Sequence, residues 1–180
     1  STRVRSSAAS DVYKRQIFYG STTGTTESLA KQIATLLDVA DADIYDVANA
    51  EVASVNAYEV LILGSPTWGL GELQDDWYSF LDKLKKVNLN GKTVALFGCG
   101  DSSSYDTTFC DAIGIIYEEL QNSGCTFCGD VDTEGYIFSD SKAVVNDRFV
   151  GLALDEINES DRTEERLNHW IQQLKQNCLQ

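Results

Sequence analysis

The chain has 180 residues, of which 43% are hydrophobic, and its formal net charge is −14. This length supports one domain with a sizeable core, and no apolar run approaches the roughly 20 residues of a membrane-spanning helix. The negative charge argues against binding to nucleic acid or to an anionic membrane, and favours a protein partner with a basic face.

The first 16 residues, STRVRSSAASDVYKRQ, differ from the rest of the chain. They carry a net charge of +3, so the other 164 residues carry −17, and they lack the apolar stretch of a secretory signal. The first strand should be central and apolar, yet Lys14, Arg15 and Gln16 directly precede Ile17. We expect residues 1–16 to be an atypical leader, either foreign or disordered, or else a genuine extension with the strand beginning at Ile17. Residues 17–180 then form a single domain.

Apolar and amphipathic stretches alternate through that domain. Short apolar runs predict strands at 17–20, 42–47, 58–65 and 91–100, and a fifth strand that begins at 126–131. Helical spacing predicts helices around 29–37, 77–84 and 109–120, the third of them ended by Gly124, and a last helix from about Asp161 with a capping box to Glu164. Strands that are buried on both faces and joined by helices indicate a three-layer α/β fold around a parallel sheet.

Residues 132–153 interrupt this rhythm. The segment is too long for an ordinary loop of such a fold and carries aromatic residues. We expect an insertion with some strand structure of its own, which splits the fifth strand. The segment FVGLAL, residues 149–154, is expected to return to the sheet.

Five cysteines without the spacing of a disulfide scaffold favour a reducing cytosol, and hence a cytoplasmic location. Cys125 and Cys128 form a C-x-x-C motif, which redox dithiols and half zinc sites share. The motif does not open a helix after a strand, and the chain has one histidine, so we expect no metal site. We interpret the pair as buried or half-buried strand cysteines, and Cys99, Cys110 and Cys178 as small hydrophobic residues.

Three loops follow the carboxyl ends of predicted strands, the edge at which open α/β sheets bind ligands. The first, YGSTTGTTES at 19–28, combines hydroxyl side chains with two glycines and has no Lys or Arg. It lacks the lysine of a nucleoside-triphosphate loop and the G-x-G-x-x-G of a dinucleotide fold. The pattern fits a single phosphate monoester held by backbone amides and hydroxyls at a helix start, or else a Ser/Thr-rich turn with an N-cap.

The other two loops each place an aromatic residue among glycines or serines. Trp68 lies in GSPTWGLGELQDDW, after the buried strand has ended, and Tyr105 lies in FGCGDSSSYDTTF. Exposed aromatic side chains at a ligand edge suggest stacking on a flat ring, whereas Trp77 falls on a helical apolar face and is expected in the core. Together the loops describe a flat heteroaromatic ligand that carries one phosphate.

These segments, in this order, resemble the flavodoxin family over about residues 17–180, and the 132–153 insertion resembles that of its long-chain members. The resemblance implies a flavodoxin-like α/β/α sandwich, a parallel sheet of order 2-1-3-4-5, and non-covalently bound FMN. It implies that residues 21–26 hold the phosphate and that Trp68 and Tyr105 enclose the isoalloxazine ring. The implied cofactor-binding residues are Ser21, Thr22, Thr23, Gly24, Thr25, Thr26, Pro66, Thr67, Trp68, Gly69, Gly71, Cys99, Gly100, Asp101, Tyr105 and Asp155, the last of these on the ribityl chain.

The resemblance also implies an electron carrier with no catalytic residue, and not an enzyme. We expect a low-potential one-electron shuttle between semiquinone and hydroquinone, in which Gly69 lets the peptide after Trp68 adopt positive φ and face flavin N5. Acidic residues near the ring, among them Asp101, Asp106 and Asp111, should make the last reduction step harder. The implied partners of this cytoplasmic, monomeric protein are basic-faced redox proteins, such as a flavodoxin or ferredoxin reductase, and low-potential electron acceptors.

An alternative with the same fold is an FMN-dependent NAD(P)H quinone reductase. It would need a nicotinamide pocket beside the ring, and the sequence has no basic residue near the predicted ring for the NADPH phosphate. A receiver-type signalling domain would need an acidic cluster after the first strand. This chain has YGSTTG there, so we reject that class.

Overall fold

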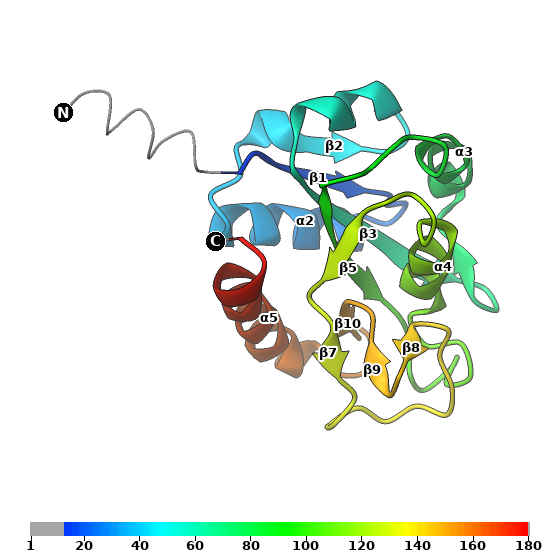
Figure 1. Cartoon of the computed structure of the whole chain (residues 1–180). Helices are drawn as coiled ribbons and strands as arrows, with labels where there is room; N and C mark the ends of the chain where they lie inside the picture. Colours follow the sequence, from blue (N-terminus) through cyan, green and yellow to red (C-terminus); the bar gives the residue numbers. More distant parts are fainter. Residues whose placement is uncertain (1–12, 180) are drawn as a thin grey trace.

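The computed structural model describes residues 13–179, whose central parallel sheet has helices on both faces (Figure 1). The strand order is β10-β5-β3-β1-β2, which confirms the predicted order 2-1-3-4-5. All neighbours on this path pair in parallel. The strands are β1 (Arg15–Tyr19), β2 (Ile44–Asp46), β3 (Val60–Trp68), β5 (Thr93–Cys99) and β10 (Leu152–Leu154).

Two short strands share the outer edge of β5. β6 (Thr126–Cys128) pairs with Thr93–Ala95, and β10 pairs with Phe97–Cys99. The fifth strand is therefore split, as predicted. The intervening insertion contains a small antiparallel sheet of order β7-β9-β8, made of β7 (Val131–Asp132), β8 (Val144–Val145) and β9 (Arg148–Phe149).

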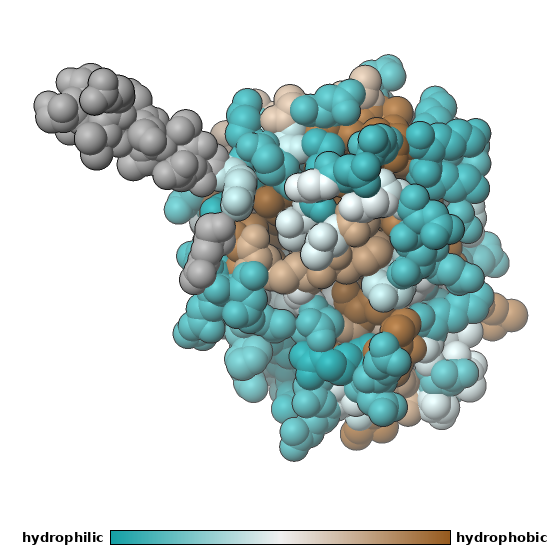
Figure 2. Space-filling view, viewed as in Figure 1, coloured by the Kyte–Doolittle hydropathy of each residue, from teal (hydrophilic) through white to brown (hydrophobic). Residues whose placement is uncertain are grey.

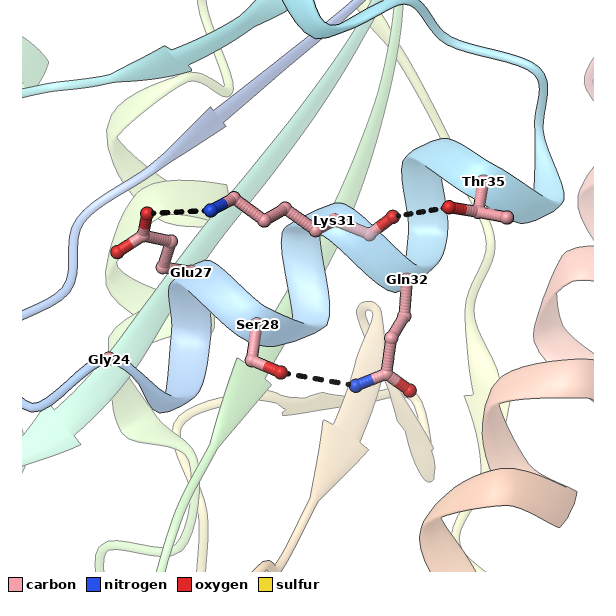
Figure 3. Close-up of a pocket in the computed structure, with 6 residues that line it drawn as sticks. All are labelled: Gly24, Glu27, Ser28, Lys31, Gln32 and Thr35. Carbon is pink, nitrogen blue, oxygen red and sulfur yellow. Dashed lines mark hydrogen bonds and ion pairs between the residues drawn. The ribbon is translucent and has the colours of Figure 1, made fainter.

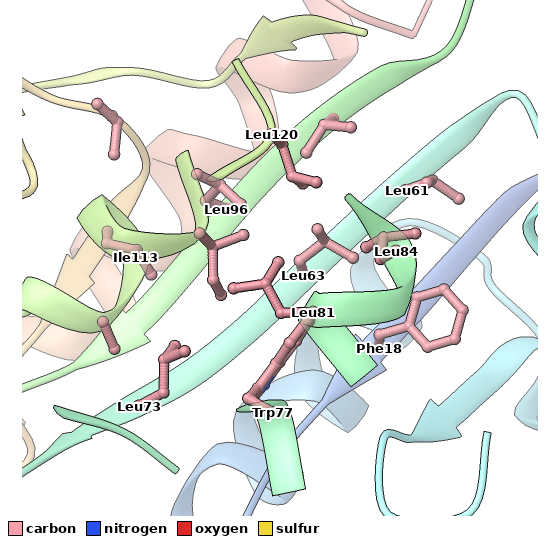
Figure 4. Packing of buried hydrophobic residues seen from close by; sticks show 14 of the residues in the cluster. Phe18, Leu61, Leu63, Leu73, Trp77, Leu81, Leu84, Leu96, Ile113 and Leu120 are labelled. Atoms are coloured by element: carbon pink, nitrogen blue, oxygen red, sulfur yellow. The ribbon is translucent and has the colours of Figure 1, made fainter. Parts of the chain in front are cut away.

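Within the described part of the chain, four α-helices cover the sheet. The apolar residues of α2 (Thr25–Leu36) and α5 (Thr163–Asn177) form one core layer with the sheet, and those of α3 (Asp75–Leu84) and α4 (Asp111–Glu119) form the other. Figure 4 shows the second layer, in which Trp77 of α3 packs among leucines of β3 and β5. Trp77 is fully buried, as predicted. Short 3₁₀ turns lie at Asp41–Asp43, Val52–Ala57 and Ser160–Arg162.

Two predicted helix boundaries are wrong. α4 ends at Glu119, and Gly124 lies beyond it in the turn before β6, with φ of 91°. A Cβ at Gly124 would lie 1.8 Å from Asn90 Oδ1, so the glycine allows two turns to approach closely. α5 is preceded by the 3₁₀ turn and has Arg162 at its N-cap without a side-chain bond, so the predicted capping box is absent.

The first strand begins two residues earlier than Ile17. Arg15 pairs with Val60 and Gln16 with Leu61, so both belong to β1, an interior strand between β3 and β2. Gln16 is fully buried, and its Nε2 donates to Ser54 Oγ at 2.9 Å while its Oε1 has no partner among the described residues. The leader proposed for residues 1–16 thus overlaps the sheet at its end, and residues 1–12 lie outside the described part.

The structure corrects the interpretation of Cys178 as a free small hydrophobic residue. Cys178 forms a disulfide with Cys128 of β6, with the two Cα atoms 6.2 Å apart. Cys125 packs against the α3/α4 layer and Cys178 against the α2/α5 layer, so Cys125 and Cys128 face opposite sides of the sheet and are no dithiol pair. The partners are 50 residues apart, and spacing could not reveal them. Cys99 and Cys110 are buried and free, as predicted.

Hydrophilic residues cover much of the face seen in Figure 2, and hydrophobic ones are exposed only in scattered places. Among residues 13–179, none of the helices combines the length and apolar character needed to cross a membrane.

Candidate functional site

Three loops lie at one edge of the sheet, because β1, β3 and β5 run in parallel and end there. They follow Tyr19, Trp68 and Cys99 (Figure 1), and the residues that the sequence selected lie in these loops, at the ends of the adjoining strands and helix, or directly after β10. Trp68 and Tyr105 are 38% and 43% exposed, as expected for side chains that could stack on a ring. Trp68 is the last residue of β3, however, and not a loop residue as predicted, because the chain turns back to pair β4 (Glu72–Leu73) with the end of β3.

The first loop is pinned by its neighbours. Gly20 N donates to Gly64 O at 3.1 Å, and a Cβ at Gly20 would lie 2.4 Å from Gln74 Oε1, so the loop touches the start of α3. Gln74 Nε2 in turn donates to Thr22 Oγ1 at 3.1 Å. Inside the loop, Gly24 N donates to Ser21 Oγ at 3.1 Å. These bonds hold the backbone of the loop in one conformation. Thr23 and Thr25 remain exposed.

Two features of this loop fit a bound anion. Gly24 is the N-cap of α2 at φ of 97°, it has no side chain to cap the helix, and nothing lies within 4 Å of where its Cβ would be. The amides of the first helical turn are thus left free to donate hydrogen bonds to an outside acceptor. Thr26 is 1% exposed, and its hydroxyl makes no hydrogen bond of standard geometry among the described residues, although the weakly accepting thiol of Cys99 lies beside it. A buried hydroxyl left without a partner is costly, so a phosphate oxygen would satisfy a donor that the fold leaves open.

The second loop is a tight turn at the end of β3. Gly71 N donates to Trp68 O at 3.1 Å, and Gly69 and Gly71 have φ of 52° and 102°. Both values lie in the left-handed region, which glycine adopts without the Cβ clash of other residues. Thr67 Oγ1 accepts Ala112 N at 3.1 Å, which ties the base of the turn to the start of α4. Pro66, which precedes Thr67 in β3, is half-buried.

The third loop is held from two sides. Gly100 N donates to Leu154 O at 2.9 Å, and a Cβ at Gly100 would lie 2.8 Å from Cys110 N. Asp101 Oδ1 accepts the amides of Ser103 and Ser104, and the bond from the Ser104 amide, foremost, lowers the pKa of Asp101. The loop that carries Tyr105 therefore has a defined shape without the ligand.

Asp155 supports the third loop and does not project freely. Its carboxylate is fully buried, and it accepts bonds from Ser102 N and Oγ, from Ile157 N, and from Asn158 N and Nδ2. Burial by itself would raise its pKa, yet these hydrogen bonds lower the pKa overall. Asp155 thus clamps the third loop to the turn after β10.

Cys99 is the last residue of β5 at this edge, but its thiol is unreactive at neutral pH. It is 8% exposed, and burial raises the pKa of its thiol to about 12. At neutral pH it stays a thiol, neither a nucleophile nor a ready metal ligand. Within residues 13–179, no group of three or more metal-ligating side chains comes together.

A shallow hollow of about 500 Å³ runs along the outer face of α2 from the Gly24 end, but it is no ligand site (Figure 3). Its side chains bond to one another at helical spacing. Lys31 Nζ lies 3.1 Å from Glu27 Oε2, and Gln32 Nε2 donates to Ser28 Oγ. They form a solvated helix face beside the first loop.

Comparison with known proteins agrees with this geometry. The family model described as Flavodoxin matches residues 17–170. The chain belongs to the flavodoxin family. It is 48% identical over 159 residues to a flavodoxin of Nostoc sp., covering 88% of this chain and 94% of that one. It is 44% identical over 161 residues to flavodoxin 1 of Escherichia coli, covering 89% and 92%.

Solved structures give the same result. The chain is similar to the Fusobacterium nucleatum flavodoxin bound to flavin mononucleotide, with a TM-score of 0.82, 32% identity, and coverage of 90% and 96%. It is also similar to oxidised flavodoxin 1 of Bacillus cereus, with a TM-score of 0.65 and 26% identity over 89% and 97% of the chains. The family confirms the predicted fold and the predicted class, an FMN-based electron carrier, and it does not favour the quinone-reductase alternative.

Sequence reasoning missed two residues that shape the site. Gln74 is 2% exposed, caps α3 by accepting Asp76 N, and holds Thr22. Glutamine is a rare N-cap, so no pattern marked it. Asp111 was predicted only as one of several acidic residues near the ring, but it is 2% exposed, and burial raises its pKa. In the sequence, the only indication of a structural role for Asp111 is its position at the start of the predicted helix.

Proposed function

We propose that this flavodoxin holds FMN at the carboxyl edge of its sheet through the residues predicted from sequence, and passes single electrons between protein partners. The observation that carries the proposal is the first loop, where a buried hydroxyl without a partner lies beside an uncapped helix start. When bound, FMN supplies the redox chemistry, gaining and losing one electron at a time. The protein supplies binding, orientation and electrostatics.

The first loop would bind the phosphate without a cation. The amides at the start of α2, with the Thr26 hydroxyl and those of Ser21, Thr22, Thr23 and Thr25, give neutral donors around one anion. The segments 17–30 and 60–82 contain no Lys or Arg, nor does 93–141. Positive charge near the flavin would favour its reduction, so a neutral cage is consistent with a low-potential carrier.

The second and third loops would hold the ring. Trp68 and Tyr105 would stack on its two faces, and backbone groups of Thr67, Gly69, Gly100 and Asp101 would line its polar edge. Gly69 has positive φ, so its carbonyl could turn toward flavin N5 with little strain. The roles of Pro66, Gly71 and Cys99 are those of close packing at the loop bases.

In this proposal, Asp155 is mainly a support for the third loop, and direct binding of the ribityl chain is secondary. Its carboxylate oxygens accept hydrogen bonds from five donor atoms within the protein, so a ribityl hydroxyl would have to share an oxygen with one of these donors. We propose that it acts mainly by holding the third loop.

The partners we propose are redox proteins with basic faces, such as a ferredoxin-type reductase, and low-potential acceptors, which meet the protein as a monomer. Exposed Glu72, Asp75 and Asp76 border the second loop, and the net charge is −14. Attraction of this kind is screened by salt, so the rate of reduction by such a reductase should fall as ionic strength rises. A rate independent of salt would contradict the docking proposal.

We also propose a cytoplasmic location. The Cys128–Cys178 disulfide opposes it, because a reducing cytosol keeps most thiols reduced. Mass spectrometry of the protein, alkylated at the moment of cell lysis, would report whether this bond forms in the cell.

The test of the phosphate cage compares two ligands and two variants. Thr26→Val keeps the shape of a buried side chain and removes its hydroxyl, whereas Thr35→Val removes an exposed hydroxyl from the same helix and is the matched control. Flavin fluorescence titrations with FMN and with riboflavin give the dissociation constants. Thr26→Val should weaken FMN binding about tenfold, the effect of roughly 1.4 kcal/mol, and leave riboflavin binding unchanged. An equal loss for both ligands would contradict a phosphate contact at Thr26.

A further inference from the structure

The turn between Trp68 and Gly71 rests on a buried carboxylate. A Cβ at Gly71 would lie 2.6 Å from Asp111 Oδ2 and 3.3 Å from Thr108 Cβ, so the backbone at Gly71 lies directly against both residues. Asp111 is 2% exposed. This contact fixes the far end of the turn in which Gly69 lies.

The same carboxylate is held from the other side by the insertion. Asp111 Oδ1 accepts Lys142 N at 2.7 Å. Gly114, one helical turn further along α4, lets the chain at Lys142 approach, because a Cβ there would lie 2.4 Å from Lys142 O. Asp111 is thus a junction between the insertion and the turn.

The insertion is bonded to the third loop as well. Asp106 O accepts Ser139 N at 2.8 Å and Asp140 N at 3.0 Å. Ser141 Oγ donates to Phe109 O and accepts Ala143 N. Residues 139–143 therefore lie along the segment that runs from Tyr105 to α4, with several bonds that a free surface loop would not make.

We propose that Asp111 is a positioning residue that transmits the placement of insertion residues 139–143 to the turn at Gly69–Gly71, and thereby sets FMN affinity and the separation of its two one-electron potentials. The inference rests on the proposed function, in which Gly69 faces the flavin. Asp111 acts through Gly71 and does not touch the flavin itself. The insertion is then a support of the redox site.

Position and charge can be separated by two substitutions. Asp111→Asn keeps an oxygen that can accept Lys142 N and nearly the same shape, but it removes the charge. Asp111→Ala removes both the acceptor and the contact with Gly71. The matched charge control is Asp147→Asn, an exposed residue of the insertion with φ of 64°, a conformation that Asn adopts as readily as Asp.

The measurements are FMN dissociation constants from fluorescence and the two midpoint potentials from a spectroscopic titration. Asp111→Ala should raise the dissociation constant about tenfold. It should bring the two potentials closer by about 60 mV, the equivalent of a tenfold change for a one-electron step. Asp111→Asn should stay within about threefold, or roughly 0.7 kcal/mol, of the unsubstituted protein. Asp147→Asn should match the unsubstituted protein in both measurements.

A second variant tests the insertion side and guards against misfolding at Asp111. Ser141→Ala removes the bonds to Phe109 O and Ala143 N without touching Asp111, and it should shift the potentials in the same direction as Asp111→Ala. An unchanged potential separation in Ser141→Ala would overturn the link to the insertion, whether or not Asp111→Ala folds. Equal shifts in Asp111→Asn and Asp111→Ala would show a charge effect and overturn the positioning role. If the unsubstituted chain bound no FMN, the proposed function would fall first and this inference with it.

Discussion

The buried glutamine in an interior strand gives the most direct test of how the sequence limits stability. Gln16 is fully buried in β1, opposite Leu61, and its Oε1 has no partner among the described residues. Gln16→Leu removes an unsatisfied acceptor, which costs about 1–3 kcal/mol when buried, and it loses one neutral hydrogen bond to Ser54, worth about 0.5–1.5 kcal/mol. Ser54 is half-buried and can turn to water.

The net expectation is a gain of about 1 kcal/mol in unfolding free energy, together with a rise in Tm of about 2–4 °C for a chain of this size. Urea unfolding followed by circular dichroism gives the free energy, and thermal scans give Tm. Gln32→Leu is the matched control, because Gln32 is exposed on α2 and the same change there should have little effect. A Gln16→Leu protein that is no more stable than the parent would refute the argument that a polar residue in this interior strand is a cost.

Four further results are expected. Replacing Cys128 and Cys178 by serine should cost about 4 kcal/mol of unfolding free energy, because the bond closes a loop of 50 residues, and an unchanged urea midpoint would mean that the bond does not form. Gly69→Ala, which forces a Cβ to φ of 52°, should bring the two one-electron potentials closer, and a titration that shows the same separation would remove Gly69 from the site. Asp101 and Asp155 have lowered pKa values in the folded chain, so their stabilising contribution is present above the unfolded pKa of about 3.9 and is lost as pH falls below it. Asp155→Asn should flatten the decline in stability measured below about pH 4, and an unaltered decline would exclude this carboxylate.

The layered fold could be predicted because its strands are apolar on both faces and its helices carry one apolar stripe. Such patterns are local, and they also predicted the split fifth strand. The strand order came from the family resemblance, and it is confirmed. Loop residues with unusual chemistry were also visible, since Trp68 and Tyr105 stand among glycines or serines where no core packing demands them.

The rest depends on contacts between distant residues. Nothing near Cys128 in the sequence points to Cys178, and nothing near Asp111 points to Gly71 or Lys142. From its residue type alone, the Asp155 carboxylate was expected to bind the ligand. In the structure, it accepts hydrogen bonds from the backbone amides of Ser102 and Ile157. Burial of a single polar side chain is decided by how segments pack, and a periodic pattern reports on whole elements.

The split edge strand also dictates when the site can form during synthesis. β10 lies near the end of the chain, yet Leu154 O holds the Gly100 amide at the start of the third loop. While the chain emerges from its N-terminus, β1, β3 and β5 can pair long before β10 is available, so the edge that carries the three loops stays incomplete until β10 has been made. A nascent chain stalled before β10 should therefore contain a formed sheet centre and no ordered third loop.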